Sequence, residues 1–149
     1  MMHKFLDGSL VSGYGDVAQL VLRVALGIIF VWHGYDKIFT TGLGNVAGFL
    51  GSVGIPFSGV LVYVLAYGEL IFGLLLIVGL FAYVAAKFAT VVAIVAFFTV
   101  HLPNGFVISN GGYEYIMLIF AAAISVLIMG AGKYSLDAMW WKKDRGGMM

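Results

Sequence analysis

The 149-residue chain contains no cysteine, and only 10% of its residues are charged. The absence of cysteine excludes disulfides, thiolate metal ligands and cysteine-based redox chemistry on this chain. If electrons pass through the protein, a bound cofactor or a partner must therefore carry them. The net charge is only +1, and the few basic residues cannot neutralise several phosphates, so nucleic acid is excluded as a partner.

Hydrophobic residues, in contrast, make up 62% of the chain, whereas soluble domains contain about 45–50%. Crossing about 30 Å of hydrocarbon takes about 20 apolar residues in a helix. Four segments qualify, at 17–39, 57–82, 83–102 and 112–130, and a tight turn near residues 81–87 must separate the middle two. We therefore expect an all-α fold, a transmembrane four-helix bundle that forms one domain over residues 1–149 in the lipid bilayer.

Two shorter segments flank these spans. Between the first and second spans, the apolar residues Val46, Phe49, Leu50 and Val53 share one helical face. This segment is too short to span, so it is predicted to be an amphipathic helix at the membrane interface. Residues 133–149 are predicted to form an interfacial tail, because two tryptophans there adjoin three basic residues, namely Trp140, Trp141, Lys142, Lys143 and Arg145.

The distribution of basic residues predicts the orientation. With four crossings, one side of the membrane receives most of them, and the other receives little beyond Lys37; the richer side has Lys4, Lys87, Lys133, Lys142, Lys143 and Arg145. Basic residues favour the cytoplasmic side. We expect a multi-pass protein of the inner (plasma) membrane with both termini in the cytoplasm, and with the loops around 40–56 and 101–112 on the outer face.

Ionisable residues inside the spans are costly, at least about 2.5 kcal/mol each, so their positions are informative. A projection at 100° per residue places Arg23, His33 and Lys37 on one face of the first helix, and Glu69 with Gly73 and Leu76 on one face of the second. The same projection aligns Lys87 with Phe98 and His101, and Glu114 with Ala121 and Ser125. We expect these four faces to point into the bundle.

Depth divides the ionisable residues into two groups. Glu69 lies about 18 Å below the outer end of its helix, within side-chain reach of Arg23, so an Arg23–Glu69 pair is predicted. The pair has two open interpretations, a structural ion pair that fixes helix register or a catalytic carboxylate coupled to a proton or a quinol.

The second group, His33, Lys37, His101 and Glu114, is predicted to converge at the outer mouth. A histidine beside a carboxylate can relay protons or hydrogen-bond a quinone carbonyl, so this group is the candidate cofactor-binding site. Alternatively, water and neighbouring side chains satisfy these polar groups. Two histidines could also ligate a haem, but nothing else in the chain marks such a site, and no metal site is predicted.

Five stretches of the chain form a distinctive set, namely RVALGIIFVWHGYDK at 23–37, Gly54-Ile-Pro56 followed by Glu69, HLPNGF at 101–106, NGGYEY at 110–115 and GAGKYSLD at 130–137. They resemble the DoxX family of small bacterial and archaeal membrane proteins, the last three in order and spacing. The likeness covers roughly residues 17–138 and implies a four-helix membrane fold.

The family takes its name from its similarity to the DoxD subunit of an archaeal thiosulfate:quinone oxidoreductase. The resemblance therefore implies a quinone-linked redox subunit that acts with a soluble or membrane redox partner. Whether the chain is itself an enzyme stays open. The first alternative is a non-catalytic membrane scaffold for redox or stress-response proteins. The second is a small-solute transporter, which would need a homo-oligomer to enclose a path.

Overall fold

The computed structural model describes residues 14–140, and every regular element among them is helical. The four longer helices are α2 (Gly15–Tyr35), α4 (Ser58–Val78), α5 (Ala82–Ala96) and α6 (Glu114–Met129). The short helix α3 (Leu43–Ser52) lies between α2 and α4, and residues 97–113, which include short π- and 3₁₀-helical turns, connect α5 to α6. Within residues 14–140, three stretches are long and apolar enough to cross a membrane, namely Gly15–Thr40, Ser58–Val78 and Ala82–Asn104. Helix α6 is apolar but shorter.

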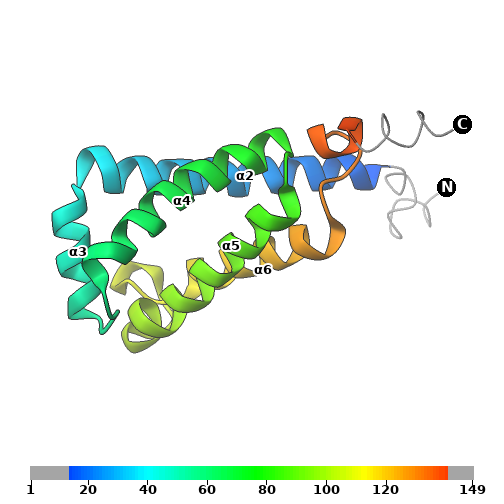
Figure 1. Ribbon diagram of the computed structural model, residues 1–149. Helices are drawn as coiled ribbons and strands as arrows, with labels where there is room; N and C mark the ends of the chain where they lie inside the picture. Colours follow the sequence, from blue (N-terminus) through cyan, green and yellow to red (C-terminus); the bar gives the residue numbers. More distant parts are fainter. Residues whose placement is uncertain (1–13, 141–149) are drawn as a thin grey trace, which may run out of the picture.

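The helices form two contacting pairs. Helix α2 packs along α4, and α5 packs along α6, while further contacts join α4 to α5 and α2 to α6. Figure 1 shows α3 closing one end of the molecule, and the beginning of α2 and the end of α6 lying together at the opposite end. The short helix predicted between the first two spans is therefore present, with Val46 buried.

The turn between α4 and α5 lies at residues 79–81, earlier than the predicted 81–87. Gly79 ends α4 with a positive φ of 70°, a conformation that glycine adopts without strain. Asp137 then caps α5, because its carboxylate accepts hydrogen bonds from the backbone N–H groups of Phe81 (2.9 Å) and Ala82 (3.0 Å). Lys87 consequently lies inside α5 rather than in the turn.

The core consists of small and branched apolar side chains. Helix α5 contributes an alanine face, which packs against α2, α4 and α6; the fully buried residues of this face are Ala82, Ala85, Ala86, Ala89 and Ala93. The predicted inward face is confirmed for α4, where Glu69 is buried, and in part for α2, where Arg23 and Gly34 are buried but His33 is exposed. The prediction is wrong for α5, because Lys87 and Phe98 are exposed, and small residues allow closer helix contact than a polar stripe does.

The prediction of an inward-pointing polar face is also wrong for most of α6. Ala121 is exposed and Ser125 only partly buried, whereas Ile119, Ala123 and Val126 form the buried face.

Glycines bring α2 and α4 into backbone contact. A Cβ atom on Gly73 would lie 2.7 Å from the backbone N of Val31 and 2.8 Å from the carbonyl O of Gly27. A Cβ on Gly34 would lie 2.6 Å from the N of Leu70. The two helices run antiparallel, so this contact fixes which residues of α2 and α4 face each other.

Gly73→Ala is expected to lower the free energy of unfolding by about 1–3 kcal/mol, because the added methyl group forces the α2 and α4 backbones apart. Gly59→Ala is the matched control in α4, since a Cβ there meets nothing within 4 Å. Thermal unfolding in mild detergent measures both variants. Equal unfolding midpoints for the two variants would contradict the close approach of the α2 and α4 backbones at Gly73.

The C-terminal part of the described chain is attached to the start of α2. Lys133 pairs with Asp16 at 3.4 Å, and the side-chain amide of Gln19 donates a hydrogen bond to the carbonyl of Gly130. Ser135 caps the next short helix by accepting a hydrogen bond from Ala138 N at 3.1 Å, as its sequence position suggests. The rest of the predicted tail, from Trp141 onward, and Lys4 lie outside the described residues.

Candidate functional site

A cavity of about 420 Å³ lies between the α2–α4 and α5–α6 pairs at the α3 end of the molecule. Small-molecule sites in proteins usually measure about 300–1,000 Å³ and are mostly apolar with a few polar groups. This cavity has that character, because aliphatic and aromatic side chains form most of its wall. Its polar lining residues include His33, Lys37, Glu69, Thr99 and His101.

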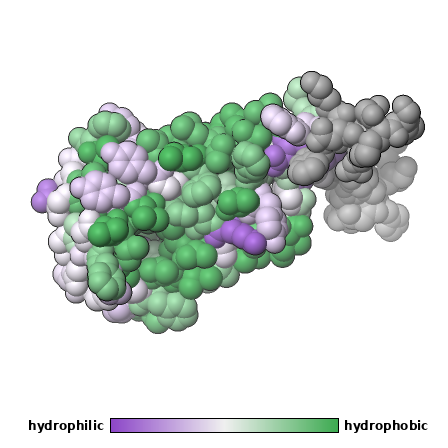
Figure 2. Space-filling model, in the orientation of Figure 1, coloured by the Kyte–Doolittle hydropathy of each residue, from purple (hydrophilic) through white to green (hydrophobic). Residues whose placement is uncertain are grey.

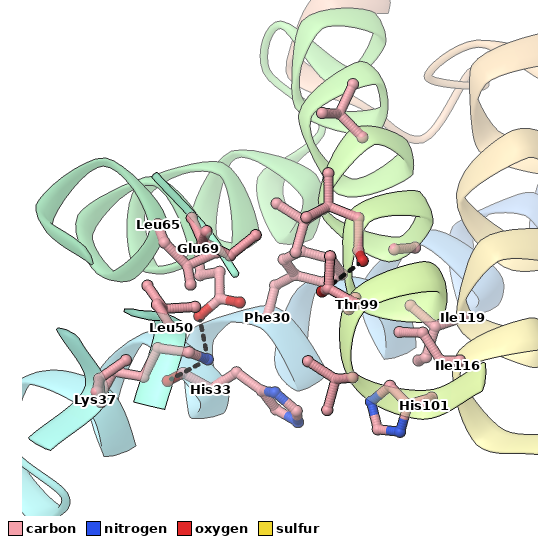
Figure 3. A pocket seen from close by; sticks show the side chains of 18 of the residues that line it. Phe30, His33, Lys37, Leu50, Leu65, Glu69, Thr99, His101, Ile116 and Ile119 are labelled. Atoms are coloured by element: carbon pink, nitrogen blue, oxygen red, sulfur yellow. Dashed lines mark hydrogen bonds and ion pairs between the residues drawn. The ribbon is translucent and has the colours of Figure 1, made fainter. Parts of the chain in front are cut away.

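A buried ion pair forms the polar part of the wall. Lys37 Nζ lies 2.6 Å from Glu69 Oε2, and the two side chains are only 18% and 5% exposed. Lys37 also donates a longer hydrogen bond of 3.4 Å to the carbonyl of His33. Figure 3 shows the lysine reaching along α2 to meet the carboxylate at the cavity. The pair therefore places one positive and one negative charge together in an apolar chamber.

The position of this pair follows from the glycine contact. A Cβ on Gly34 would meet the backbone of Ala66 and Leu70, so α2 touches α4 on both sides of Glu69. Lys37 follows one helical turn later, which brings its flexible side chain to the carboxylate. At this point α2 widens into a π-helical turn, Asp36–Thr40, in which Thr41 N donates to the carbonyl of Asp36 at 2.8 Å.

A second π-helical turn ends α5 on the opposite wall of the cavity. It spans Phe97–His101 and supplies Thr99 and His101 to the lining. Short π-helical segments occur frequently at functional sites, because the extra residue per turn redirects side chains. Two of them flank this cavity, and nothing in the sequence pattern predicted either.

The hydrogen bonding of His101 determines which of its ring nitrogens can face a ligand. His101 Nδ1 lies 2.7 Å from the carbonyl O of Gly111. A carbonyl only accepts, so Nδ1 carries the hydrogen, and in the neutral ring Nε2 is left as an acceptor. The imidazole of His33 also projects toward the cavity, as Figure 3 shows.

The predicted Arg23–Glu69 pair is wrong. The Arg23 guanidinium donates to the carbonyls of Leu76 (2.5 Å), Ile77 (3.1 Å) and Tyr134 (2.8 Å). The carbonyls of the last turn of a helix lack donors within that helix, and Arg23 supplies donors for two of them at the end of α4. Ile77 lies eight residues beyond Glu69, or about 12 Å along the helix.

The predicted outer group is brought together only in part. His33, Lys37 and His101 line the cavity, and Glu69 joins them, but Glu114 does not. Glu114 lies in the first turn of α6, and its carboxylate accepts a hydrogen bond of 2.9 Å from the backbone N of Ile108. It therefore holds the loop that precedes α6, and Tyr115 takes the neighbouring place in the wall. Among residues 14–140, no cluster of three or more His, Asp or Glu residues could hold a metal ion.

The membrane-length apolar helices and the charged pair buried between them define a multi-pass helical membrane protein with a cavity between its helices. The family model named DoxX matches residues 18–102, a range that contains Lys37, Glu69 and His101. The chain belongs to the DoxX family.

Similarity to individual proteins extends over most of the chain. The chain is 32% identical over 132 residues to a Bacillus subtilis (strain 168) protein named "Putative oxidoreductase CatD". The match covers 89% of this chain and 93% of that protein. The chain is also 31% identical over 126 residues to a Haemophilus influenzae protein named "Uncharacterized protein", covering 82% of this chain and 90% of the relative. No solved structure gives a significant match.

Proposed function

We propose that this DoxX-family protein binds a quinone in the cavity and serves as a quinone-linked redox subunit of the inner membrane. The observation that carries the proposal is the Lys37–Glu69 ion pair, buried in the wall of an apolar cavity that also contains two imidazoles. The oxidoreductase name of the Bacillus subtilis relative agrees with redox chemistry.

The charges of the cavity suit a neutral ring. Lys37 and Glu69 cancel, so the chamber has no net charge from this pair. Lys37 Nζ can donate a hydrogen bond to a ring carbonyl, and His101 Nε2 can accept one from a ring hydroxyl. Conversion of a quinone to a quinol takes up two electrons and two protons. His33, at the exposed rim, and His101 are the groups suited to hand over protons, and a redox partner protein supplies the electrons.

The proposed membrane arrangement has four crossings and both termini in the cytoplasm. The beginning of α2 and the end of α6 lie at one end of the molecule, with Lys133, and Lys37 lies toward the other end. At 1.5 Å per residue, the 16 residues of α6 measure about 24 Å, so the segments at its ends complete the crossing.

Binding of quinone to the purified protein tests the proposal. Wild-type protein in mild detergent is expected to bind close to one short-tailed quinone per chain in equilibrium dialysis. His101→Phe removes the acceptor for a ring hydroxyl and is expected to weaken binding of the reduced quinol about tenfold, as for a lost hydrogen bond of about 1.4 kcal/mol. Tyr67→Phe is the control, since Tyr67 is exposed and does not line the cavity. Absence of binding by folded wild-type protein would contradict the proposal.

A further inference from the structure

One opening of the cavity lies between helices α4 and α5. Four of the lining residues exposed on the outside of the molecule flank this gap, Leu61 and Val64 on α4 and Val91 and Val95 on α5; the other exposed lining residues are His33, Phe49 and Tyr115. A residue that both lines a cavity and is exposed marks its rim. The cavity therefore opens between α4 and α5 with an aliphatic rim, and His33, Phe49 and Tyr115 mark its exposed edge elsewhere.

The packing of the two helices explains why the gap is there. Helices α4 and α5 are joined by the tight turn at 79–81, and near that end the rings of Phe72 and Phe88 lie 4.7 Å apart. The Phe88 ring also fills the space beside Gly68. Farther from the turn the two helices diverge, as Figure 1 shows, and Leu61 and Val95 line the cavity there.

Helix contacts cover much of the rest of the cavity. Backbone contact at Gly34 closes the α2–α4 side, and the alanine face of α5 packs against α6. At the end of the molecule, α3 covers the cavity with its apolar face, where Val46, Phe49 and Leu50 line the wall.

The gap faces hydrocarbon rather than water. Val64 and Val91 belong to the membrane-length stretches Ser58–Val78 and Ala82–Asn104. Figure 2 shows mostly hydrophobic residues over the middle of the molecule on the face where α4 and α5 are in front. An aliphatic rim at this depth favours a hydrocarbon chain over any polar group, because no water is present there to solvate the latter.

We infer that the ligand is an amphiphile that enters from the bilayer, with its neutral ring against Lys37 and Glu69 and its hydrocarbon tail leaving between α4 and α5. The inference rests on the proposed binding of a quinone and narrows it to long-tailed, membrane-dissolved quinones. The tail occupies the rim formed by Leu61, Val64, Val91 and Val95, and the buried ion pair lies deeper in the same continuous cavity.

Bulky substitutions at the rim test the inference. Val64→Trp and Val91→Trp are expected to weaken binding of a long-tailed quinone at least tenfold and to change binding of the tail-less ring less than twofold. Val60→Trp on α4 and Val84→Trp on α5 are the controls, because both valines are exposed and neither lines the cavity. Equal effects on the two ligands, or no effect on either, would overturn the tail path and leave the quinone proposal intact.

A second measurement does not depend on quinone. A long-chain alcohol with a photoreactive group on its chain is expected to label the segments around Val64 and Val91, and Val64→Trp should reduce that labelling severalfold. Labelling spread evenly over the lipid-facing residues, including Ile28 and Trp32 on α2, would overturn the inference. Localised labelling without any quinone binding would support the tail path and contradict the proposed quinone function.

Discussion

Lys37→Met is expected to lower the free energy of unfolding by about 3–5 kcal/mol, because it leaves the Glu69 carboxylate buried without its partner. Glu69 is only 5% exposed, whereas Lys37 is 18% exposed at the end of a flexible chain. The reciprocal change, Glu69→Met, is therefore expected to cost less. Denaturant or thermal unfolding in detergent measures both effects.

Lys133→Met is the matched control for loss of a paired lysine. The Lys133–Asp16 pair is longer, at 3.4 Å, and its side chains are 58% and 38% exposed. Exposed pairs contribute about 0–1 kcal/mol, so this variant should remain close to wild type. If Lys37→Met cost no more than Lys133→Met, the buried pair would not have the stabilising role that its geometry indicates.

The double variant Lys37→Met/Glu69→Met separates structure from function. Buried ion pairs can often be replaced by apolar residues of similar size with little loss of stability, so the double variant should recover most of what Lys37→Met loses. Quinone binding is expected to stay weak in both, because the donor at Lys37 is absent. A stable double variant that binds quinone as well as wild type would show that the pair serves structure alone.

Arg23→Met is expected to lower the free energy of unfolding by about 3 kcal/mol, since it deprives the carbonyl of Leu76, which is buried, and those of Ile77 and Tyr134, which are partly buried, of their donor. Quinone binding to the folded fraction should not change, because these carbonyls lie about two helical turns from Glu69. Thermal unfolding and equilibrium dialysis on the same preparation measure both quantities.

Lys87→Met serves as the control for Arg23→Met. Lys87 is exposed, and its Nζ lies 4.5 Å from the centre of the Tyr83 ring, an interaction worth about 0.5–1 kcal/mol at exposed sites. Removing a cation from a span without removing buried hydrogen bonds should therefore cost little. Loss of quinone binding in well-folded Arg23→Met would instead support the catalytic role that the sequence suggested for Arg23.

The sequence predicted the helices well because their lengths and apolar runs are local properties. It also predicted the buried face of α4 and part of that of α2, where glycines and ionisable residues coincide. On α5 and α6 the polar residues were a poor guide, since Lys87 lies outside and the alanine face of α5 is the one that packs. Small residues determine how closely two helices approach, and a rule that follows polarity alone misses them.

The candidate site was harder to predict because it depends on the register between helices. Helix length gives the depth of each residue to within a turn or two, which was enough to group His33, Lys37 and His101. It could not decide whether Arg23 or Lys37 meets Glu69. That choice depends on the Gly34 contact and on the carbonyls that the end of α4 leaves without donors, both of which are tertiary features.

The contacts of Arg23 also constrain how the protein can be made. As the chain leaves the ribosome, Arg23 is synthesised 53 residues before Leu76 and 111 residues before Tyr134. Until then its guanidinium has none of its final acceptors, and a lone charge in hydrocarbon is costly. The first helix must therefore wait at the translocon, or hold its arginine near lipid headgroups, until α4 arrives and the nascent chain can close around it.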